Sequence, residues 1–397
     1  MKRSARGLAA TLVVVAMVSA PAPALADSAT ATLYAGSGEA GYSGDGGPAV
    51  AAALNKPGGI AVGPDGVVYV ADTENWVVRA ISTDGGISTV AGRGRPGQET
   101  PETPVRAGAT VSGSEVTLRY PASLGVGATG TVHIGDSGNF RILSLSEGGD
   151  VTLVAGGNGA GFAGDGGPAV EAQLRDVTGI DVGSDGALVF GDLRNYRVRR
   201  IGADGLIDTL VGSGDVGLVA GGEAGSFTFP YAPISTAAGA GGDRWVASTL
   251  LYGLSGTRMR AVVRDGDSRW SYSDSQGASI PAGAWRGNLH VAATGNAVYL
   301  SSDEGLYRFY PDGRVETLLA NPSFVGTLTM VDDRVGYLAD PRLNKVYRLD
   351  LPELSGGDST ADGDWWRQWW VLAIALAIVV ALVVTVAALA VSRRRRA

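Results

Sequence analysis

Two histidines are the side chains of this chain best suited to acid–base or metal chemistry near neutral pH. His133 and His290 are the full complement of histidine in 397 residues, and cysteine is absent. One chain therefore cannot supply a three-histidine zinc site, a thiolate metal site or a disulfide. Each histidine lies in strand-like sequence, where it could face a cavity as a general base or zinc ligand, or simply pack against its neighbours.

Two glycine-rich loops each carry one carboxylate. Asp45 and Asp165 lie in the segment GDGGPA, which occurs at 44–49 and again at 164–169. Loop carboxylates and carbonyls suit a hard cation such as calcium, but a tight site needs several carboxylates. We expect a structural role for both loops, with calcium as the alternative. The chain has no Gly-x-Ser-x-Gly nucleophile elbow, and its glycine-rich stretches lack the P-loop Lys-Ser/Thr that would hold a phosphate. No cofactor is expected, with calcium or zinc as the alternative.

Repeats define the elements that must hold these side chains. Residues 32–54 and 152–174 are identical at 15 of 23 positions, which indicates an internal duplication. A shorter unit recurs at 57–92, 121–156 and 177–212, with weaker copies at 288–320 and 327–351. Its apolar runs have the length of strands and are separated by Asp-Gly turns. Each unit is predicted to be an antiparallel meander of about four strands, and a ring of such units is a β-propeller.

The number of repeats predicts six blades, or seven if 213–285 contains two thin ones. The last copy ends after three strands, near Leu354. The first segment, 31–36, matches the fourth strand of other copies. We therefore expect this N-terminal strand to complete the last blade, which removes the open edges of the sheet.

The repeat motifs resemble those of the NHL-repeat family. The resemblance rests on GDGGPA, on the [IL]-x-V-G-x-x-G turn and on an Asp-x-x-Asn step, which is Asp72/Asn75 in the first copy. It is strong over 31–212 and weaker over 285–351. It implies a propeller similar to teneurin NHL regions, to the external sensor domains of bacterial membrane kinases, and to lactonase-like enzymes. Such a motif indicates the fold more firmly than the function.

The remaining repeat features have expected structural roles. The recurring Asp-x-x-Asn step is expected to close turns. Arg141 and Arg197 occupy equivalent positions, where they could bridge blades or face solvent. Tyr42 and Phe162, aligned in the two glycine-rich loops, are expected to fill the crevice between blades.

A divergent fourth blade, about 229–285, is the predicted partner-binding face. Divergence combined with aromatic residues is typical of an interaction surface. A thinly packed blade is the alternative. The residues proposed to bind a partner are Trp245, Tyr252, Trp270, Tyr272 and Trp285.

The N-terminus has the pattern of a secretory signal peptide. Basic residues precede an apolar run from Leu8 to Val18, and Ala24-Leu25-Ala26 is a small-x-small cleavage site. Residues 1–26 are therefore predicted to be removed. Residues 27–354 are the predicted extracellular propeller.

The C-terminus has the pattern of a membrane anchor. Residues 371–391 form an uncharged apolar run of 21 residues, long enough to cross a bilayer as a helix. Four tryptophans lie in the linker 355–370, and the basic tail 392–397 is predicted to be cytoplasmic. The segment Leu351–Gly356 is similar to a sortase sorting signal, although Leu354 stands where that motif has threonine.

The acidic charge of the predicted extracellular part and the predicted single-pass topology limit the classes of function to be expected. All 39 acidic residues lie between 27 and 364, so the predicted extracellular part is more acidic than the net charge of −7 for the whole chain. Such a surface disfavours nucleic acid. We expect a single-pass, membrane-anchored binding, sensor or scaffold module for a protein, glycan or small ligand. An extracellular metal-dependent propeller hydrolase or lyase using His133 and His290 is the alternative.

Overall fold

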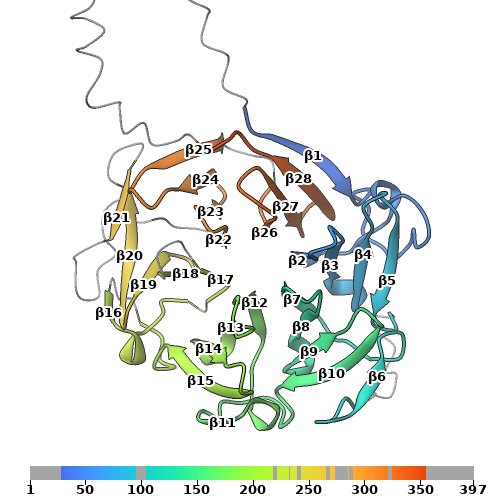
Figure 1. Cartoon of the computed structure of the whole chain (residues 1–397), viewed down its shortest axis with the longest axis horizontal. Helices are drawn as coiled ribbons and strands as arrows, with labels where there is room; N and C mark the ends of the chain where they lie inside the picture. Colours follow the sequence, from blue (N-terminus) through green and yellow to red (C-terminus); the bar gives the residue numbers. More distant parts are fainter. Residues whose placement is uncertain are drawn as a thin grey trace, which may run out of the picture. The chain divides into compact units, whose positions relative to one another are not determined.

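Six antiparallel sheets form a ring in the computed structural model (Figure 1). The structure describes residues 28–94, 104–217, 221–231, 233–238, 243–264, 269–272, 285, 289–320 and 324–354. The compact unit that contains the ring ends at Pro352. The predicted count of six blades is confirmed.

Each blade is a meander whose first strand lies nearest the ring axis. Blade 1 comprises β2 (Pro57–Val62), β3 (Val68–Asp72), β4 (Val77–Ile81) and β5 (Ile87–Ala91). Blade 2 comprises β7 (Pro121–Val126), β8 (Val132–Asp136), β9 (Arg141–Leu145) and β10 (Asp150–Ala155), with β6 (Thr110–Ser112) outside. Blade 3 comprises β12 (Val177–Val182), β13 (Leu188–Asp192), β14 (Arg197–Ile201) and β15 (Leu206–Val211), with β11 (Gly167–Pro168) outside.

The second half of the ring follows the same order. Blade 4 comprises β17 (Ser235–Ala238), β18 (Arg244–Ala247), β19 (Leu251–Ser255) and β20 (Arg258–Arg264), which pairs with β16 (Gly221–Glu223) and β21 (Trp270–Tyr272). Blade 5 comprises β22 (His290–Ala293), β23 (Val298–Ser301), β24 (Gly305–Phe309) and β25 (Val315–Ala320). Blade 6 comprises β26 (Thr327–Met330), β27 (Val335–Asp340), β28 (Lys345–Asp350) and β1 (Thr30–Ala35).

The N-terminal strand closes the ring, as the repeat alignment predicts. β1 pairs antiparallel with β28, from Thr30 opposite Asp350 to Ala35 opposite Val346. Figure 1 shows β1, at the blue end of the colour scale, beside the red β28. The closure gives β28 a partner on both sides, so this blade does not end in an open edge.

The meander gives the ring two different faces. The hairpin face carries the tight turns that join the first to the second strand and the third to the fourth strand of a blade, such as 63–67 and 82–86. The connection face carries the short 3-10 turns after the second strands, such as η2 (Thr73–Asn75) and η3 (Ser137–Asn139). Thr30 and Asp350 pair beside the 331–335 turn, so both ends of the described ring lie at the hairpin face.

Apolar residues pack between neighbouring blades. Clusters of buried side chains join blade 1 to blade 2, blade 2 to blade 3, blade 3 to blade 4, blade 4 to blade 5, and blade 6 to blade 1. The core is therefore distributed around the ring, and the axis is left for a channel.

Four predicted segments lie outside the described residues: the signal peptide 1–26, the linker 355–370, the membrane span 371–391 and the basic tail 392–397. Within the part of the chain that the structure describes, no helix is long and apolar enough to span a bilayer.

Candidate functional site: the central channel

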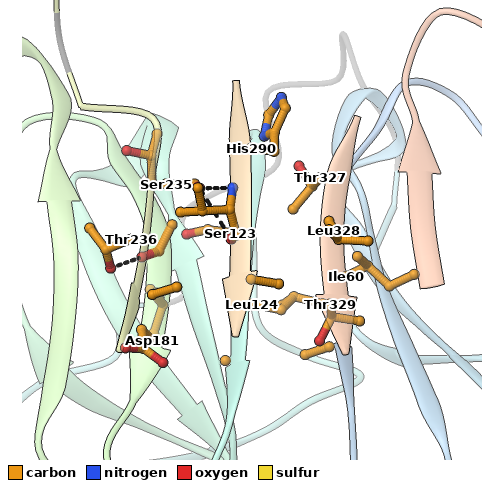
Figure 2. Close-up of a pocket in the computed structure, with 18 of the residues that line it drawn as sticks. Ile60, Ser123, Leu124, Asp181, Ser235, Thr236, His290, Thr327, Leu328 and Thr329 are labelled. Atoms are coloured by element: carbon orange, nitrogen blue, oxygen red, sulfur yellow. Dashed lines mark hydrogen bonds between the residues drawn. The ribbon is translucent and has the colours of Figure 1, made fainter. Parts of the chain in front are cut away.

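The six innermost strands line a channel of about 290 Å³ on the ring axis. Each of β2, β7, β12, β17, β22 and β26 contributes residues to its wall. Figure 2 shows His290 and Thr327 at one end of the channel, and Asp181 and Thr329 at the other. The sequence places mostly small and β-branched residues here, because six strand backbones approach one another at the axis.

Hydroxyl groups at the channel wall join one blade to the next. Ser235 Oγ accepts a hydrogen bond from the Val291 N–H at 2.8 Å. Thr236 donates to the Gly179 carbonyl at 3.2 Å, and Thr327 donates to the Gly58 carbonyl at 2.6 Å. These hydroxyls therefore satisfy backbone groups of the neighbouring strand rather than converging on a common point.

The charged group at the hairpin end of the channel is also paired. Asp181 accepts a hydrogen bond from Arg244 Nη1 at 2.5 Å, which links β12 of blade 3 to β18 of blade 4. This carboxylate and guanidinium neutralise each other beside the channel.

His290 is the channel residue with unused hydrogen-bonding capacity. It begins β22 and lines the channel, and its Nδ1 is buried without a hydrogen-bond partner. Burial lowers the pKa of His290 to about 4, against a smaller opposing effect of Asp303. The imidazole is therefore neutral at pH 7, a state in which it can accept a proton or bind a ligand.

His133 does not join His290. It lies in β8, the second strand of blade 2, and is absent from the channel lining. Its Nδ1 is also buried without a partner, and burial lowers its pKa to about 4. The prediction that both histidines serve one channel site is wrong, because β7 stands between β8 and the axis.

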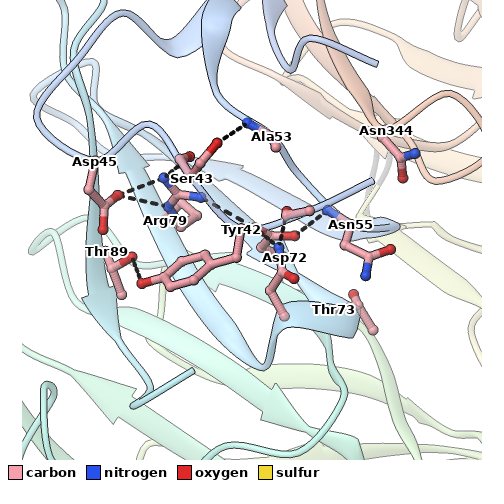
Figure 3. Close-up of polar contacts among 12 residues, drawn as sticks. Tyr42, Ser43, Asp45, Ala53, Asn55, Asp72, Thr73, Arg79, Thr89 and Asn344 are labelled. Carbon is pink, nitrogen blue, oxygen red and sulfur yellow. Dashed lines mark hydrogen bonds and ion pairs between the residues drawn. The ribbon is translucent and has the colours of Figure 1, made fainter. Parts of the chain in front are cut away.

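The two loop aspartates form ion pairs with buried arginines. Arg79 Nη2 lies 2.6 Å from Asp45 Oδ1 (Figure 3). In the duplicated segment, Arg199 Nη2 lies 2.6 Å from Asp165 Oδ1. The positive charge that balances each carboxylate is thus a guanidinium of the chain itself, which speaks against the calcium alternative. No group of three His, Cys, Asp or Glu side chains suited to a metal ion occurs among the residues described.

The sequence analysis missed these buried arginines. Arg79 and Arg199 occupy the third position of the third strand of their blades, Arg308 occupies the fourth position of the third strand of blade 5, and all three are completely buried. The available signal was an arginine inside an otherwise apolar strand, as in VVRAI at 77–81. A charge at such a position is buried only when partners are present.

The Asp-x-x-Asn step closes a turn. Asp72 accepts hydrogen bonds from the Asn55 N–H at 2.7 Å and from Asn75 Nδ2 at 2.8 Å. Asp192 makes the same contacts with Arg175 and Asn195 in blade 3. Burial raises the pKa of Asp72 and of Asp192 to about 6, although the hydrogen bonds and the nearby arginines act in the opposite direction.

Arg141 and Arg197, which the sequence analysis left as either bridging blades or facing solvent, differ in their contacts. Arg141 is buried and donates to Asp136 Oδ2 at 2.8 Å, inside its own blade. Arg197 donates to the Ser213 carbonyl at 2.5 Å. Arg141 thus supplies blade 2 with the cation that Arg79 supplies in blade 1.

Tyr42 and Phe162 cover the buried arginines. Tyr42 is 48% exposed and Phe162 is 40% exposed, so neither fills a crevice between blades as expected. The Arg79 guanidinium lies 5.2 Å from the Tyr42 ring centroid, and that of Arg199 lies 5.1 Å from the Phe162 centroid. Both contacts are cation–π interactions that shield an ion pair.

The predicted aromatic partner face is mostly core. Trp245, Tyr252 and Trp285 are 3%, 0% and 2% exposed, because they fill the spaces on the two sides of blade 4. Trp270 is partly buried and its ring lies 4.9 Å from that of Trp245. The backbone of Tyr272 pairs with Val262 in β20. The prediction that these residues form a docking surface is wrong for the three that are buried.

Comparison with known proteins supports the repeat assignment. Residues 36–156 match the family model "Teneurin NHL domain". Teneurin-m of Drosophila melanogaster is 31% identical over 173 residues, which cover 40% of this chain and 6% of that protein. The chloroplastic protein SUPPRESSOR OF QUENCHING 1 of Arabidopsis thaliana is 32% identical over 162 residues, 39% of this chain and 15% of that protein. The chain thus spans a small part of the length of these relatives.

A solved structure shows the same fold. It is a structural genomics protein of unknown function from Bacteroides thetaiotaomicron, with a TM-score of 0.51 and 12% identity over 81% of this chain and 76% of that one. At this identity the likeness concerns the fold alone. The described part of the chain is a six-bladed β-propeller, and residues 36–156 within it match the teneurin NHL family model.

Proposed function

We propose that this propeller is a non-catalytic binding module, displayed outside the cell on a C-terminal transmembrane segment. The observation that carries the proposal is how the polar side chains at the channel are used. Ser235, Thr236, Thr327 and the Asp181–Arg244 pair all hold neighbouring blades together. A catalytic site instead needs groups that converge on a reacting atom.

The display outside the cell rests on the sequence at the two ends. A cleavable signal at 1–26 and an apolar run at 371–391 followed by arginines favour a single-pass chain with its propeller outside. The described ring begins and ends at its hairpin face. That arrangement leaves the connection face available to a partner.

Membrane fractionation of cells expressing the full-length chain tests the anchor. We expect the chain to remain in the membrane pellet after an alkaline carbonate wash and to be released by detergent. A version that ends at Leu354 is the matched control and is expected in the medium. Release of the full-length chain by carbonate would contradict the anchor.

His290 supports a second candidate function. Its neutral imidazole and unpartnered Nδ1 could serve as a general base or metal ligand in a lactonase-like hydrolase or lyase. Lactone hydrolysis by the purified chain, with and without added zinc or calcium, tests this candidate. Activity that His290→Asn abolishes and His133→Asn retains would favour the enzyme. Absence of turnover in every condition would leave the binding module.

A further inference from the structure

A second hollow lies away from the channel, between blades 2 and 3. It has a volume of about 610 Å³ and is lined by parts of 104–107, 138–141, 156–159 and 170–171, together with Arg119 and Leu153. Asn139 and Phe140 belong to the turn after β8, which places this groove on the connection face. We call it the blade 2–3 groove.

The groove carries uncompensated positive charge. Arg106 and Arg119 both line it, both are exposed, and neither forms an ion pair with any of the described residues. Arg141 also lines the groove, but its guanidinium is held by Asp136 and by the Thr117 carbonyl. Glu171 is the acidic residue of the lining. Two arginines without an ion-pair partner among the described residues, against one carboxylate, leave the groove lining positive on a chain whose net charge is −7.

Blade 2 lacks an ion pair that blades 1 and 3 form beside the turn after their second strands. In blade 1, Lys56 pairs with Glu74 at 3.1 Å, and in blade 3, Asp176 pairs with Arg194 at 2.5 Å. The equivalent residues in blade 2 are Tyr120 and Gly138. In blades 1 and 3 the ion pair joins the residue before the first strand to the turn after the second strand. Blade 2 cannot form this ion pair. We call this place the corner of the blade.

Gly138 keeps the corner open for a steric reason. A Cβ at this position would lie 2.8 Å from the Arg119 carbonyl oxygen and 2.8 Å from Arg119 Cβ. No larger residue fits there without a backbone shift, so the side chain that would pair across this corner is excluded. Arg119 instead contacts the Trp76 ring, at 5.8 Å from its centroid.

The groove wall favours a sugar over an extended peptide. The N–H groups of Gly156 and Gly157 already donate to the carbonyls of Ala169 and Val170, at 3.1 and 3.0 Å. A peptide strand therefore finds no free backbone edge at these residues. Phe140 and Leu153 add half-buried apolar surface beside the arginines. Apolar surface next to guanidinium donors suits a pyranose ring that carries a carboxylate.

We propose that the blade 2–3 groove binds an acidic saccharide, a chain of uronic acid units whose carboxylates are held by Arg106 and Arg119. The proposal deepens the proposed binding function by naming a ligand class. It depends on the folded propeller and not on the membrane anchor. Failure of the anchor and failure of this site therefore give different experimental results.

Calorimetric titration of the purified full-length chain with hexagalacturonic acid tests the proposal. We expect binding that weakens with salt, and no binding of the neutral hexasaccharide maltohexaose. Arg106→Gln and Arg119→Gln are each expected to raise Kd by about tenfold or more, because each removes a charge-assisted contact. Arg175→Gln is the matched control, since Arg175 is the exposed blade 3 equivalent of Arg119 and lies outside the groove lining.

Three results would overturn the proposal. The first is no measurable binding of hexagalacturonic acid by a chain that melts cooperatively. The second is an equal loss for Arg175→Gln, which would show attraction to surface charge in general. The third is binding of poly-glutamate as tight as that of hexagalacturonic acid, with the same dependence on Arg106 and Arg119. That result would make the groove a site for acidic peptides.

Discussion

Arg79 is completely buried, and its Nη2 lies 2.6 Å from Oδ1 of Asp45, which belongs to a loop 34 residues earlier in the chain. The same guanidinium lies 3.4 Å from the buried carboxylate of Asp72. The duplicated segment reproduces this arrangement with Arg199, Asp165 and Asp192. The glycine-rich loop is thus attached to its blade through one cation that serves two carboxylates.

Replacing Arg79 by an uncharged residue is expected to lower the free energy of unfolding strongly. Arg79→Leu would leave Asp72 buried without its counter-charge, and such a change lowers the free energy of unfolding by about 3–5 kcal/mol. Urea denaturation monitored by tryptophan fluorescence measures it. Arg200→Leu is the control, because Arg200 forms an exposed pair with Asp185 and its loss should cost no more than about 1 kcal/mol. Equal effects of the two substitutions would contradict the role given to Arg79.

The tryptophans between blades 4 and 5 are expected to matter for stability. Trp285→Ala or Trp245→Ala removes a large buried ring from a packed cluster and should lower the free energy of unfolding by about 3–5 kcal/mol. Tyr231→Ala is the control, because Tyr231 is 64% exposed. A Trp285→Ala variant as stable as the wild type would restore the view that this region is a surface.

β1 is expected to tolerate a charged side chain at an exposed position but not at a buried one. Ala35 is completely buried and Leu33 is 44% exposed, and both lie in the same strand. Ala35→Asp should lower the melting temperature and promote aggregation, because it disturbs the closure and frees the edge of β28. Leu33→Asp should change the melting temperature little. Scanning calorimetry and size-exclusion chromatography check both, and a harmless Ala35→Asp would contradict the closure.

The buried histidines and aspartates are expected to make stability depend on pH in opposite directions. Burial lowers the pKa of His133 from 6.5 to about 4. Between these values the unfolded chain binds a proton that the folded chain does not, so His133 reduces stability as the pH falls. Burial raises the pKa of Asp72 from 3.8 to about 6. There the folded chain binds the extra proton, so Asp72 reduces stability as the pH rises from about 4 to 6.

A single substitution separates the two effects. His133→Tyr places at this position the residue that blade 1 has at Tyr69, and it removes the histidine contribution. We expect the variant to gain stability relative to the wild type at pH 4.5, and to gain less at pH 7.5. Urea denaturation at the two pH values measures this difference. A pH-independent difference between the two proteins would show that His133 is not protonated on unfolding.

Features of the fold that recur in each repeat and depend on nearby residues could be predicted from the sequence. Asp-Gly turns, strand-length apolar runs and the match of 31–36 to fourth strands predicted six meanders and their closure by β1. Features that depend on contacts between distant segments were not predictable in this way. Trp285 was assigned to a surface because its blade lacks the repeat motif, but it packs against Tyr307 and Phe309 of the next blade. The Arg79–Asp45 pair was missed because the two residues meet only when the loop folds over the third strand.

The site could be predicted only in part. His290 was correctly placed near the channel, since it starts the innermost strand of blade 5. His133 was not, because the sequence did not show that the second strand of a blade lies one layer away from the axis. The blade 2–3 groove was not predictable, because its lining comes from segments that are far apart in the sequence, such as 104–107 and 156–159.

Surface labelling of lysine tests the central claim most directly, namely that the propeller is displayed outside the cell to bind a partner. The chain has three lysines, Lys2, Lys56 and Lys345, and the predicted signal cleavage removes Lys2. Lys56 has a side chain that is 62% exposed on the connection face. Intact cells treated with a membrane-impermeant amine-reactive biotin reagent should therefore carry biotin on Lys56, and Lys56→Arg should remove that label. Labelling of Lys56 only after the cells are lysed would place the propeller inside and contradict the account.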